Sequence, residues 1–280
     1  MQPDNTKSDV RFLPQLEGDN PFVEFKLGHM PFHAGIAGGN GAPVTITYPS
    51  PLNHGINDPA VDGTRHLWSG SDQNRQQAKL WYFSSTYLAN VLILSSPIKA
   101  ENERPPANPI RIADIARSLY REDIEPVLMD LDMEFSFADP IEGRDGVIRK
   151  TKSGAYASYT VRFQTKPRPL TAEELAAVET HGLHDLRAEF GPRPTDEQIA
   201  VLAEMFHASL HGEPFDAARW GAAYPGLKVQ EVRGSLVPLP PSNGNGRASR
   251  YDADDKPAAE DGLTKQTLSA LRSRVTTMSA

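Results

Sequence analysis

The feature of this sequence that most constrains its fold is a change of pattern near Pro169. Upstream, short segments such as "NPFVEFKLGHMPF" (20–32) and "VTITY" (44–48) read as strands, and Gly and Pro separate them. Downstream, "PLTAEELAAVETHGLHDLRAEF" (169–190) and "PTDEQIAVLAEMFHASLHG" (194–212) carry apolar residues at helical spacing. Strands followed by helices predict an α+β fold.

Individual elements follow from local patterns. Thr171 stands three residues before Glu174, the capping-box arrangement of a helix start. The segment "GVIRKTKSGAYASYTVRFQTKP" predicts a β-hairpin that turns near Ser153 and Gly154. Further upstream, "LWYFSSTYLANVLILSS" predicts a strand pair, "VLMDLDMEFSFADP" a strand, and "IADIARSLY" a helix.

The composition changes again after the helical region, and it divides the chain into four parts. We expect an N-terminal arm over 1–9 and a folded core over 10–230 with its helical subregion at 171–226. A flexible polar linker follows over 231–262, rich in Pro, Gly, Ser, Asn and Asp. Residues 263–280 predict a short amphipathic helix whose apolar face is made by Leu268, Leu271, Val275 and Met278.

Several classes of protein are excluded or disfavoured by what the sequence lacks. Cysteine is absent, which excludes disulfides and thiolate metal sites. No apolar run is long enough to span a bilayer, and the N-terminal "MQPDNTKSDV" is polar, so we expect a cytoplasmic protein without a membrane partner. No nucleophile motif is present and the Gly-rich loops follow no strong strand, so we expect neither an enzyme nor a cofactor.

Charge is segregated along the chain although the net charge is −7. The segment 144–168 carries seven Lys or Arg against one acid, and the preceding segment 122–142 carries eight acids and no base. Tyr156 and Tyr159 lie within the basic segment, flanked by Lys and Arg. Tyrosines that stack on bases beside cations that follow phosphates are the ordinary means of binding single strands without sequence choice. A basic hairpin is, however, also a common solvated face.

The aromatic segment "LWYF" (80–83) raises a related question. Alternation along a strand would send Trp81 and Phe83 to the core and leave Tyr82 on the other face, followed by Tyr87. Alternation alone leaves open what Tyr82 and Tyr87 do on that other face.

Two other arrangements keep catalytic and metal chemistry open. Asp130, Asp132 and Glu134 alternate in "DLDMEF" and could hold divalent cations for phosphodiester hydrolysis, although a charged strand edge explains them more simply. His207 and His211 have the i, i+4 spacing of a zinc site. No acid adjoins the first of them as in a zinc-protease helix, so two surface histidines are favoured.

Two segments carry a resemblance to a known family. "YLANVLILSSPIKAENE" and, after a helix, "FADPIEGRDGVIRKTKSGAYASYTVRF" with "KPRPLT" resemble the single-stranded DNA-binding proteins of T-even and related phages over about residues 10–226. The matching positions are Asp139, Pro140, Gly143, Asp145, Lys152, Gly154, Tyr156, Tyr159 and Phe163. The resemblance implies an OB-fold-like five-stranded β-barrel with packed helices and a cleft for single-stranded DNA.

The sequence departs from that family in three places. Members of that family often carry a structural zinc held by a cysteine-containing knuckle. This sequence has "TYPSPLNHG" (47–55) at the corresponding place and contains no Cys, so we expect ordinary packing to hold the loop over 33–75. The basic N-terminal arm is missing, and the tail ends in a basic amphipathic segment instead of an acidic run. The motif "LRSRVTT" suggests that a role in cooperative binding has moved to the C-terminus.

The resulting prediction is a non-catalytic protein that coats single-stranded DNA in phage replication, recombination and repair, with self-association along DNA and protein partners at the tail. The alternatives are a metal-dependent nuclease at Asp130, Asp132 and Glu134, or a structural or interaction protein that ignores DNA. The expected DNA-binding residues are Tyr82, Tyr87, Arg144, Arg149, Lys150, Lys152, Tyr156, Tyr159, Arg162 and Lys166.

Overall fold

The computed structural model describes residues 4–15, 20–98, 108–130, 135–153 and 156–231. The chain divides into two units, Met1–Val232 and Arg233–Ala280, and the described residues all belong to the first. The expected C-terminal helix lies outside the described residues, as does the expected linker except for Glu231, which ends the last strand.

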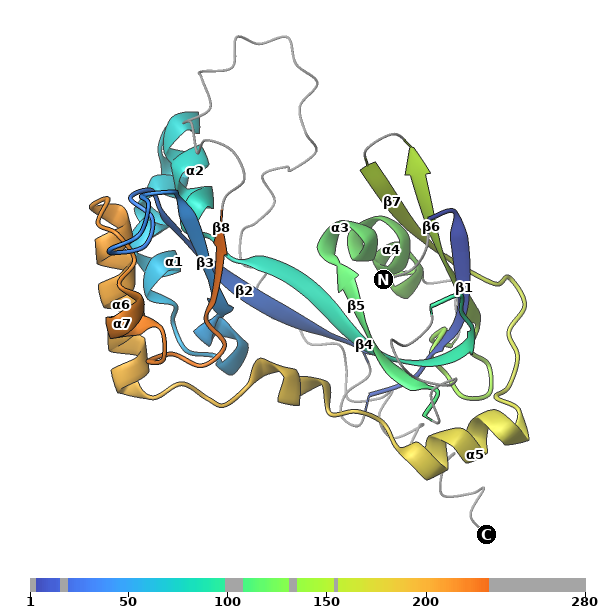
Figure 1. The fold of residues 1–280 in the computed structure, drawn as a ribbon. Coiled ribbons are helices and arrows are strands. Elements are labelled where there is room, and N and C mark those ends of the chain that lie inside the picture. The colour runs from blue at the N-terminus through green and yellow to red at the C-terminus, as the bar shows by residue number, and fades with distance from the viewer. Residues whose placement is uncertain (1–3, 16–19, 99–107, 131–134, 154–155, 232–280) are drawn as a thin grey trace. The chain divides into compact units, whose positions relative to one another are not determined.

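The core of the first unit is a sheet of eight strands in which every strand pair is antiparallel (Figure 1). The strands are β1 (Thr6–Phe12), β2 (Phe22–Phe32), β3 (Val44–Pro49), β4 (Ser84–Ser95), β5 (Ile110–Ala116), β6 (Asp145–Ser153), β7 (Tyr156–Phe163) and β8 (Lys228–Glu231). Their order is β7-β6-β1-β4-β2-β3-β8, with β5 paired to β4. The expected arm over 1–9 therefore already contains the start of β1.

The sheet is open, so the expected five-stranded OB-type barrel is wrong. The reason lies in β4, which pairs with β2 through Ser84–Ala89 and with β1 through Val91–Ser95. β5 pairs with residues 86–92 and so occupies the other edge of β4. Closure requires the outer strands to pair with each other. Among the described strands, β5, β7 and β8 each have a single partner, so these edges do not close.

Helices flank the sheet, and most are short. They are α1 (Pro59–Thr64), α2 (Asp72–Ala78), α3 (Arg117–Leu119), α4 (Glu125–Leu128), α5 (Ala172–His181), α6 (Asp196–Leu210) and α7 (Ala217–Trp220), with a π-helical turn, η4 (Tyr120–Ile124), between α3 and α4. Short 3₁₀ turns are η1 (Pro51–His54), η2 (Arg65–Ser69), η3 (Lys79–Trp81) and η5 (Leu186–Phe190).

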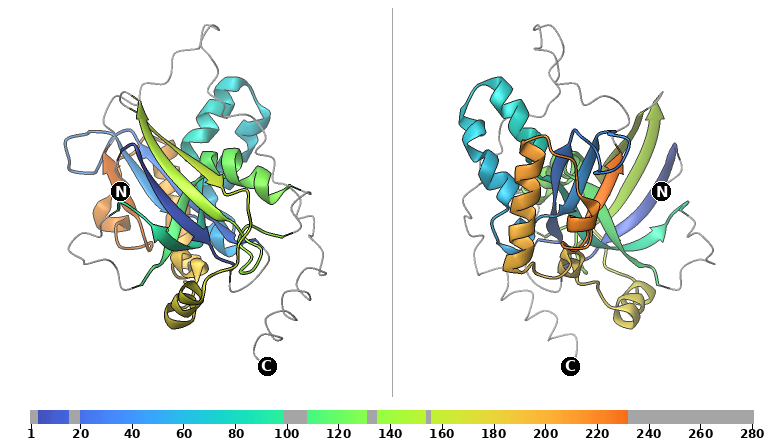
Figure 2. Two further views of the ribbon diagram at one scale, coloured as in Figure 1. Left: turned by 90° about the vertical axis from the view of Figure 1, so that its right-hand side faces the viewer. Right: turned by 60° about the vertical axis from the view of Figure 1, so that its left-hand side comes forward.

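The two predicted helices after Pro169 are confirmed as α5 and α6. Both begin with a complete capping box, in which Thr171 and Thr195 each exchange hydrogen bonds with the residue three positions later. Gly212 follows the end of α6 with φ 74°, the left-handed conformation that ends many helices. In Figure 2, α6 runs alongside the strands, and it contacts both β2 and α1.

Three predicted elements are wrong. The strand pair predicted over 80–96 is a single strand, β4, preceded by the turn η3. The segment predicted as a helix at "IADIARSLY" is strand β5 through Ala116, because pairing with β4 along seven residues outweighs a helical spacing that spans barely two turns. The predicted strand over 127–140 begins inside helix α4, at Val127 and Leu128. Strand β8 was not anticipated.

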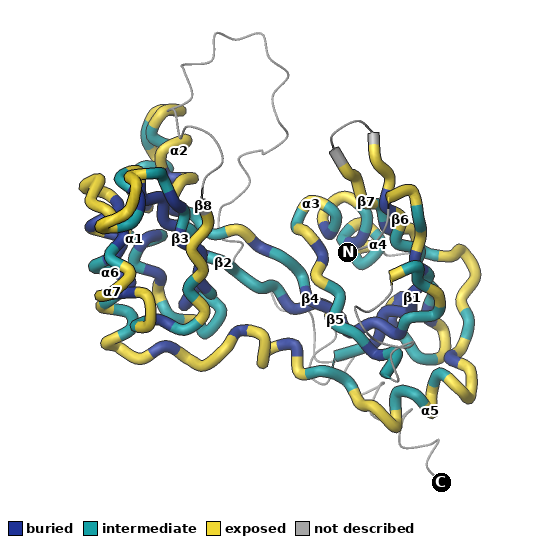
Figure 3. The backbone as a smooth tube through the Cα atoms, viewed as in Figure 1, coloured by how far each residue is buried: buried dark blue, intermediate teal, exposed yellow. Residues whose placement is uncertain are grey.

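Two buried clusters form the main core. One lies where β2 and β3 pack against α6 and α7, and contains Met30, Phe32, Ile46, Leu202 and Phe215. The other lies where β1, β4, β5 and β7 meet η4, and is rich in aromatic rings, including Phe12, Phe22, Tyr120 and Phe137. Figure 3 shows buried residues along the strands, whereas the free end of the β6–β7 hairpin is largely exposed.

Candidate nucleic-acid interface

The β6–β7 hairpin carries most of the predicted cationic residues, and its register decides which of them lie together. Lys150 is directly opposite Tyr159, and Lys152 is opposite Ala157. Directly paired residues of antiparallel strands project from the same face, and alternate residues along one strand share it. Lys150, Lys152 and Tyr159 therefore lie on one face, which we call the hairpin face.

The hairpin face is continuous with the aromatic core. Ile148 and Val161 are paired two positions further along the same face and belong to the second buried cluster. Lys150 Nζ lies 5.9 Å from the centre of the Tyr159 ring, and 38% of Tyr159 is exposed. A cation thus stands beside an exposed phenol ring where the core ends.

Arg149 and Arg162 lie on the opposite face of the hairpin. Arg149 is paired with Thr160, and Arg162 with Val147, one residue out of phase with the lysines. Both arginines are exposed. The predicted cations therefore do not line a single groove: a strand of nucleic acid on the hairpin face would not contact these two arginines directly.

The remaining predicted residues of the basic segment are more scattered. Arg144 is half-buried before β6, where its backbone N–H donates to the carbonyl of Phe137. Lys166 is exposed between β7 and α5. Tyr156 is the first residue of β7 and pairs with Ser153, but its side chain lies outside the described part of the chain.

An acidic residue that the sequence did not single out contacts both lysines of the hairpin face. Lys150 Nζ lies 2.7 Å from Asp4 Oδ1, and Lys152 Nζ lies 3.1 Å from Asp4 Oδ2. Hydrogen bonding to Lys150 is the main cause that lowers the pKa of Asp4, and the same bond raises the pKa of Lys150. No local sequence signal connects residues 146 positions apart, so only the tertiary structure reveals this contact.

The base of the hairpin is anchored by a charged network centred on Arg11. The Arg11 side chain is fully buried and donates to Asp145 Oδ1 at 3.2 Å and to the carbonyls of Asp139 and Arg168 at 2.8 and 2.9 Å. Arg168 in turn pairs with Asp145 at 2.7 Å and contacts both carboxylate oxygens of Glu174, the capping-box residue of α5. Asp145 therefore joins β1, β6 and α5, which is a structural role.

Tyr87 packs against the second buried cluster. Its ring stacks on Tyr120 with centroids 3.7 Å apart and planes 6° from parallel. Burial is the main cause that raises the pKa of Tyr87 to about 12. One face of the ring is thus covered, which argues against Tyr87 as a platform for a base.

Tyr82 is not in a strand, contrary to the prediction. Trp81 belongs to η3 and is buried, and Tyr82 caps that turn. Tyr82 stacks on Phe83 at 4.3 Å and meets the edge of Trp68 at 5.0 Å, while Lys26 Nζ lies 5.4 Å over Phe83. All three rings are half-buried, so Trp68 and Phe83 join Tyr82 in a surface cluster that alternation along a strand could not predict.

This aromatic cluster is remote from the hairpin along the sheet. Tyr82 precedes the first residue of β4, whereas β1, which carries the hairpin, pairs with β4 from Val91 onward. At about 3.3 Å per residue, these points are separated by roughly 25–30 Å along the strand. The structure therefore does not bring Tyr82 to the hairpin face.

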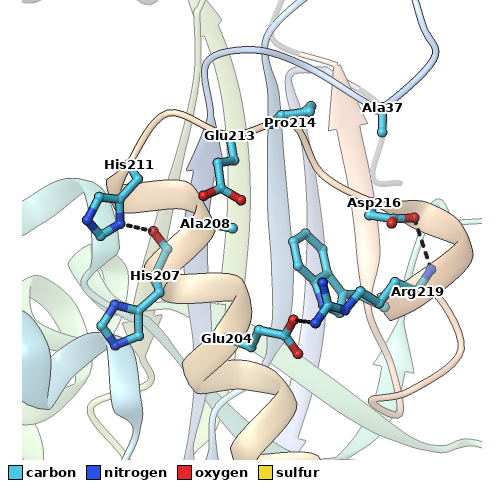
Figure 4. A pocket seen from close by; sticks show the side chains of 10 residues that line it. Ala37, Glu204, His207, Ala208, His211, Glu213, Pro214, Asp216 and Arg219 are labelled. Atoms are coloured by element: carbon cyan, nitrogen blue, oxygen red, sulfur yellow. Dashed lines mark hydrogen bonds and ion pairs between the residues drawn. The ribbon is translucent and has the colours of Figure 1, made fainter.

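A pocket of about 340 Å³ lies between the C-terminal half of α6 and α7 (Figure 4). His207 and His211 are both exposed, with ring centres 6.2 Å apart, and His211 Nδ1–H donates to the carbonyl of His207 at 2.7 Å. Glu204, one turn before His207 on α6, forms an ion pair with Arg219 of α7. Across the described ranges, no group of three or more metal-ligating side chains could hold a metal ion.

The segment "TYPSPLNHG" (47–55) is held by a buried carboxylate, that of Asp58. Asp58 accepts hydrogen bonds from Ser50 Oγ at 2.6 Å, from Tyr48 Oη at 3.1 Å and from the backbone N–H of Ala60 at 3.0 Å. Burial is the main cause that raises the pKa of Asp58. The expectation that ordinary packing holds the loop over 33–75 did not identify this buried polar network, which joins β3 to α1.

The predicted nuclease residues are only partly described. Asp130 is exposed after α4, and Asp132 and Glu134 fall outside the described residues.

Comparison with known proteins finds no family model and no curated protein that matches the chain. The resemblance to phage single-stranded DNA-binding proteins therefore stays a prediction from sequence motifs. No helix among the described residues is long and apolar enough to cross a bilayer.

Proposed function

We propose that this protein binds single-stranded nucleic acid, with DNA as the expected ligand, across the hairpin face. The observation that carries the proposal is the grouping of Lys150, Lys152 and exposed Tyr159 on one face at the margin of the aromatic core. The segment from Val147 to Gln164 contains no acidic residue. A phenol ring that stacks on a base, flanked by ammonium groups that bind phosphates, requires no particular base sequence.

The acidic net charge does not oppose this proposal, because binding depends on the local field and not on the total charge. The single strand of nucleic acid would lie along the free end of the hairpin, where the described side chains are largely exposed. The broader role in coating DNA during phage replication, recombination and repair is proposed from the motif resemblance alone. The proposed activity requires no catalysis.

The test is a titration of labelled oligo-dT with the full chain, followed by fluorescence anisotropy at several salt concentrations. Tyr159→Ala should weaken binding by about 5- to 150-fold, because one stacked base contributes about 1–3 kcal/mol. Tyr159→Phe keeps the ring and should bind almost as wild type does. Equal affinities of the Ala and Phe variants would show that the ring does not stack on a base.

The lysines are tested by the salt dependence of the same titration. Lys152→Gln should reduce the slope of log K against log salt by about 0.7, the value for one phosphate contact on a single strand. Arg149→Gln is the matched control, because it removes one charge from the same strand on the opposite face. If Arg149→Gln reduces the slope and Lys152→Gln does not, the nucleic acid lies on the other face.

A further inference from the structure

The N-terminal turn of the described chain is docked on the lysines of the hairpin face. Asp4 reaches Lys150 and Lys152, and the Asn5 side-chain oxygen accepts a hydrogen bond from the backbone N–H of Lys152 at 3.1 Å. Asn5 has φ 57°, a left-handed conformation that is uncommon outside glycine and that turns Asp4 back over the strand. The regular pairing of β1 with β6 begins immediately afterwards, at Thr6 and Lys150.

The contact of Asp4 with the two lysines has the form of a phosphate contact. Its two carboxylate oxygens each meet a different ammonium group, at 2.7 and 3.1 Å. A phosphodiester likewise carries its negative charge on two non-bridging oxygens, and Lys recognises such an anion chiefly as a point charge. The anion position of the hairpin face is thus already filled by a residue of the protein itself.

The accessibility of the two lysines differs in a way that follows from this docking. Only 8% of the Lys150 side chain is exposed, against 49% for Lys152. Lys150 lies beneath the docked turn and beside Tyr159, whereas Lys152 lies one pleat closer to the end of the hairpin. A phosphate could reach Lys152 while Asp4 is in place, but contact with Lys150 requires the turn to move.

We propose that Asp4 occupies the position at which a backbone phosphate of the single strand binds, and that it must be displaced for full binding. This inference rests on the proposed function and adds an internal competitor to it. Displacement of Asp4 breaks one ion pair with nearly buried Lys150, one with half-exposed Lys152, and the contact of Asn5. It leaves the β1–β6 pairing intact because that pairing starts at Thr6. Asp4 is 37% exposed, so water already reaches the carboxylate that the phosphate would replace.

Because Asp4 competes with the phosphate for Lys150 and Lys152, the wild type should bind single-stranded DNA less tightly than these two lysines alone would allow. In the wild type, each strand that binds leaves the Asp4 carboxylate without its lysine partners, next to the phosphate backbone. Removing that charge leaves one more unit of positive charge for the nucleic acid to neutralise. The affinity should therefore rise, and its salt dependence should become steeper.

The experiment compares Asp4→Asn with Asp9→Asn in the full chain, by oligo-dT titration at 50 and 200 mM salt. Asp9 is the matched control: it lies in β1, just after the turn that carries Asp4, pairs with exposed Lys7 at 3.3 Å, and projects from the opposite face, because it is paired with Val147. Asp4→Asn should steepen the salt slope by about 0.7, so affinity should fall about threefold more than in the wild type over this fourfold range of salt. At 50 mM salt it should bind at least about threefold more tightly than the wild type.

Asp9→Asn should change neither quantity appreciably, because a charge on the other face is screened over a Debye length of about 10 Å at 0.1 M salt. Asp4→Glu keeps the charge and should restore wild-type affinity. If the wild type binds oligo-dT and Asp4→Asn does not differ from Asp9→Asn, the role of Asp4 is overturned while the proposed function stands. If neither the wild type nor Asp4→Asn binds oligo-dT, both proposals fail. If Asp4→Asn binds oligo-dT and the wild type does not, both proposals are supported.

Discussion

Replacing Arg11 by methionine tests whether the buried charged network holds the base of the hairpin. Methionine preserves most of the side-chain length and removes the charge together with the hydrogen bonds to Asp145 and to the carbonyls of Asp139 and Arg168. Each carbonyl that loses its donor costs roughly 1–3 kcal/mol, or about 4 kcal/mol for the pair. Asp145 keeps Arg168 as a partner and is partly exposed, so it adds little.

The Nε atom of Arg11 acts in the opposite direction. Arg11 Nε is buried and has no hydrogen-bond partner in the described part of the chain, so its removal regains about 2 kcal/mol. The net expectation is a loss of about 2 kcal/mol of unfolding free energy, or about 4–8 °C in Tm for a folded unit of this size.

The assay is urea unfolding followed by tryptophan fluorescence, with Arg149→Met as the control. Arg149 is exposed on the neighbouring strand, so its replacement should change the unfolding free energy by less than about 0.5 kcal/mol. An Arg11→Met protein as stable as the wild type would refute the reasoning. It would mean that the cost of burying the guanidinium equals everything its hydrogen bonds contribute.

Two further predictions concern the other end of the sheet. Because burial raises the pKa of Asp58, the folded state binds more protons than the unfolded state between about pH 4 and that raised pKa. The unfolding free energy of the wild type should therefore fall relative to that of Asp58→Asn as pH rises through this window, which urea midpoints at several pH values will show; a constant difference would contradict it. Ser209→Ala removes the hydroxyl that accepts from Trp81 Nε1 at 2.9 Å and donates to the carbonyl of Pro31 at 2.5 Å. This substitution should lower the unfolding free energy by about 2–4 kcal/mol because two buried groups lose their partner. The control Ser158→Ala, at an exposed position of β7, should change it by less than about 0.5 kcal/mol. Equal urea midpoints for Ser209→Ala and the wild type would refute the prediction.

Parts of this structure could be read from short stretches of sequence because the interactions that form them are local. The capping box at Thr171 lies within four residues of chain and correctly predicted where α5 begins, and the apolar spacing of the next segment was sufficient to predict α6. The β6–β7 hairpin also forms between neighbours in the chain, so its alternation and turn residues were sufficient to predict it. The cationic and aromatic character of the candidate site was visible for the same reason.

The tertiary structure decided the rest, because the interactions concerned join residues far apart in the chain. Ile112 and Ile115 became strand through pairing with β4, and the three-way sharing of β4 left the sheet open where a barrel had been expected. Alternation along β6 already places Arg149 and Lys150 on opposite faces, but only packing decides which of the two faces continues into the core. The meeting of Asp4 with Lys150 depends on a strand pairing that spans more than half of the chain, and no short pattern encodes it.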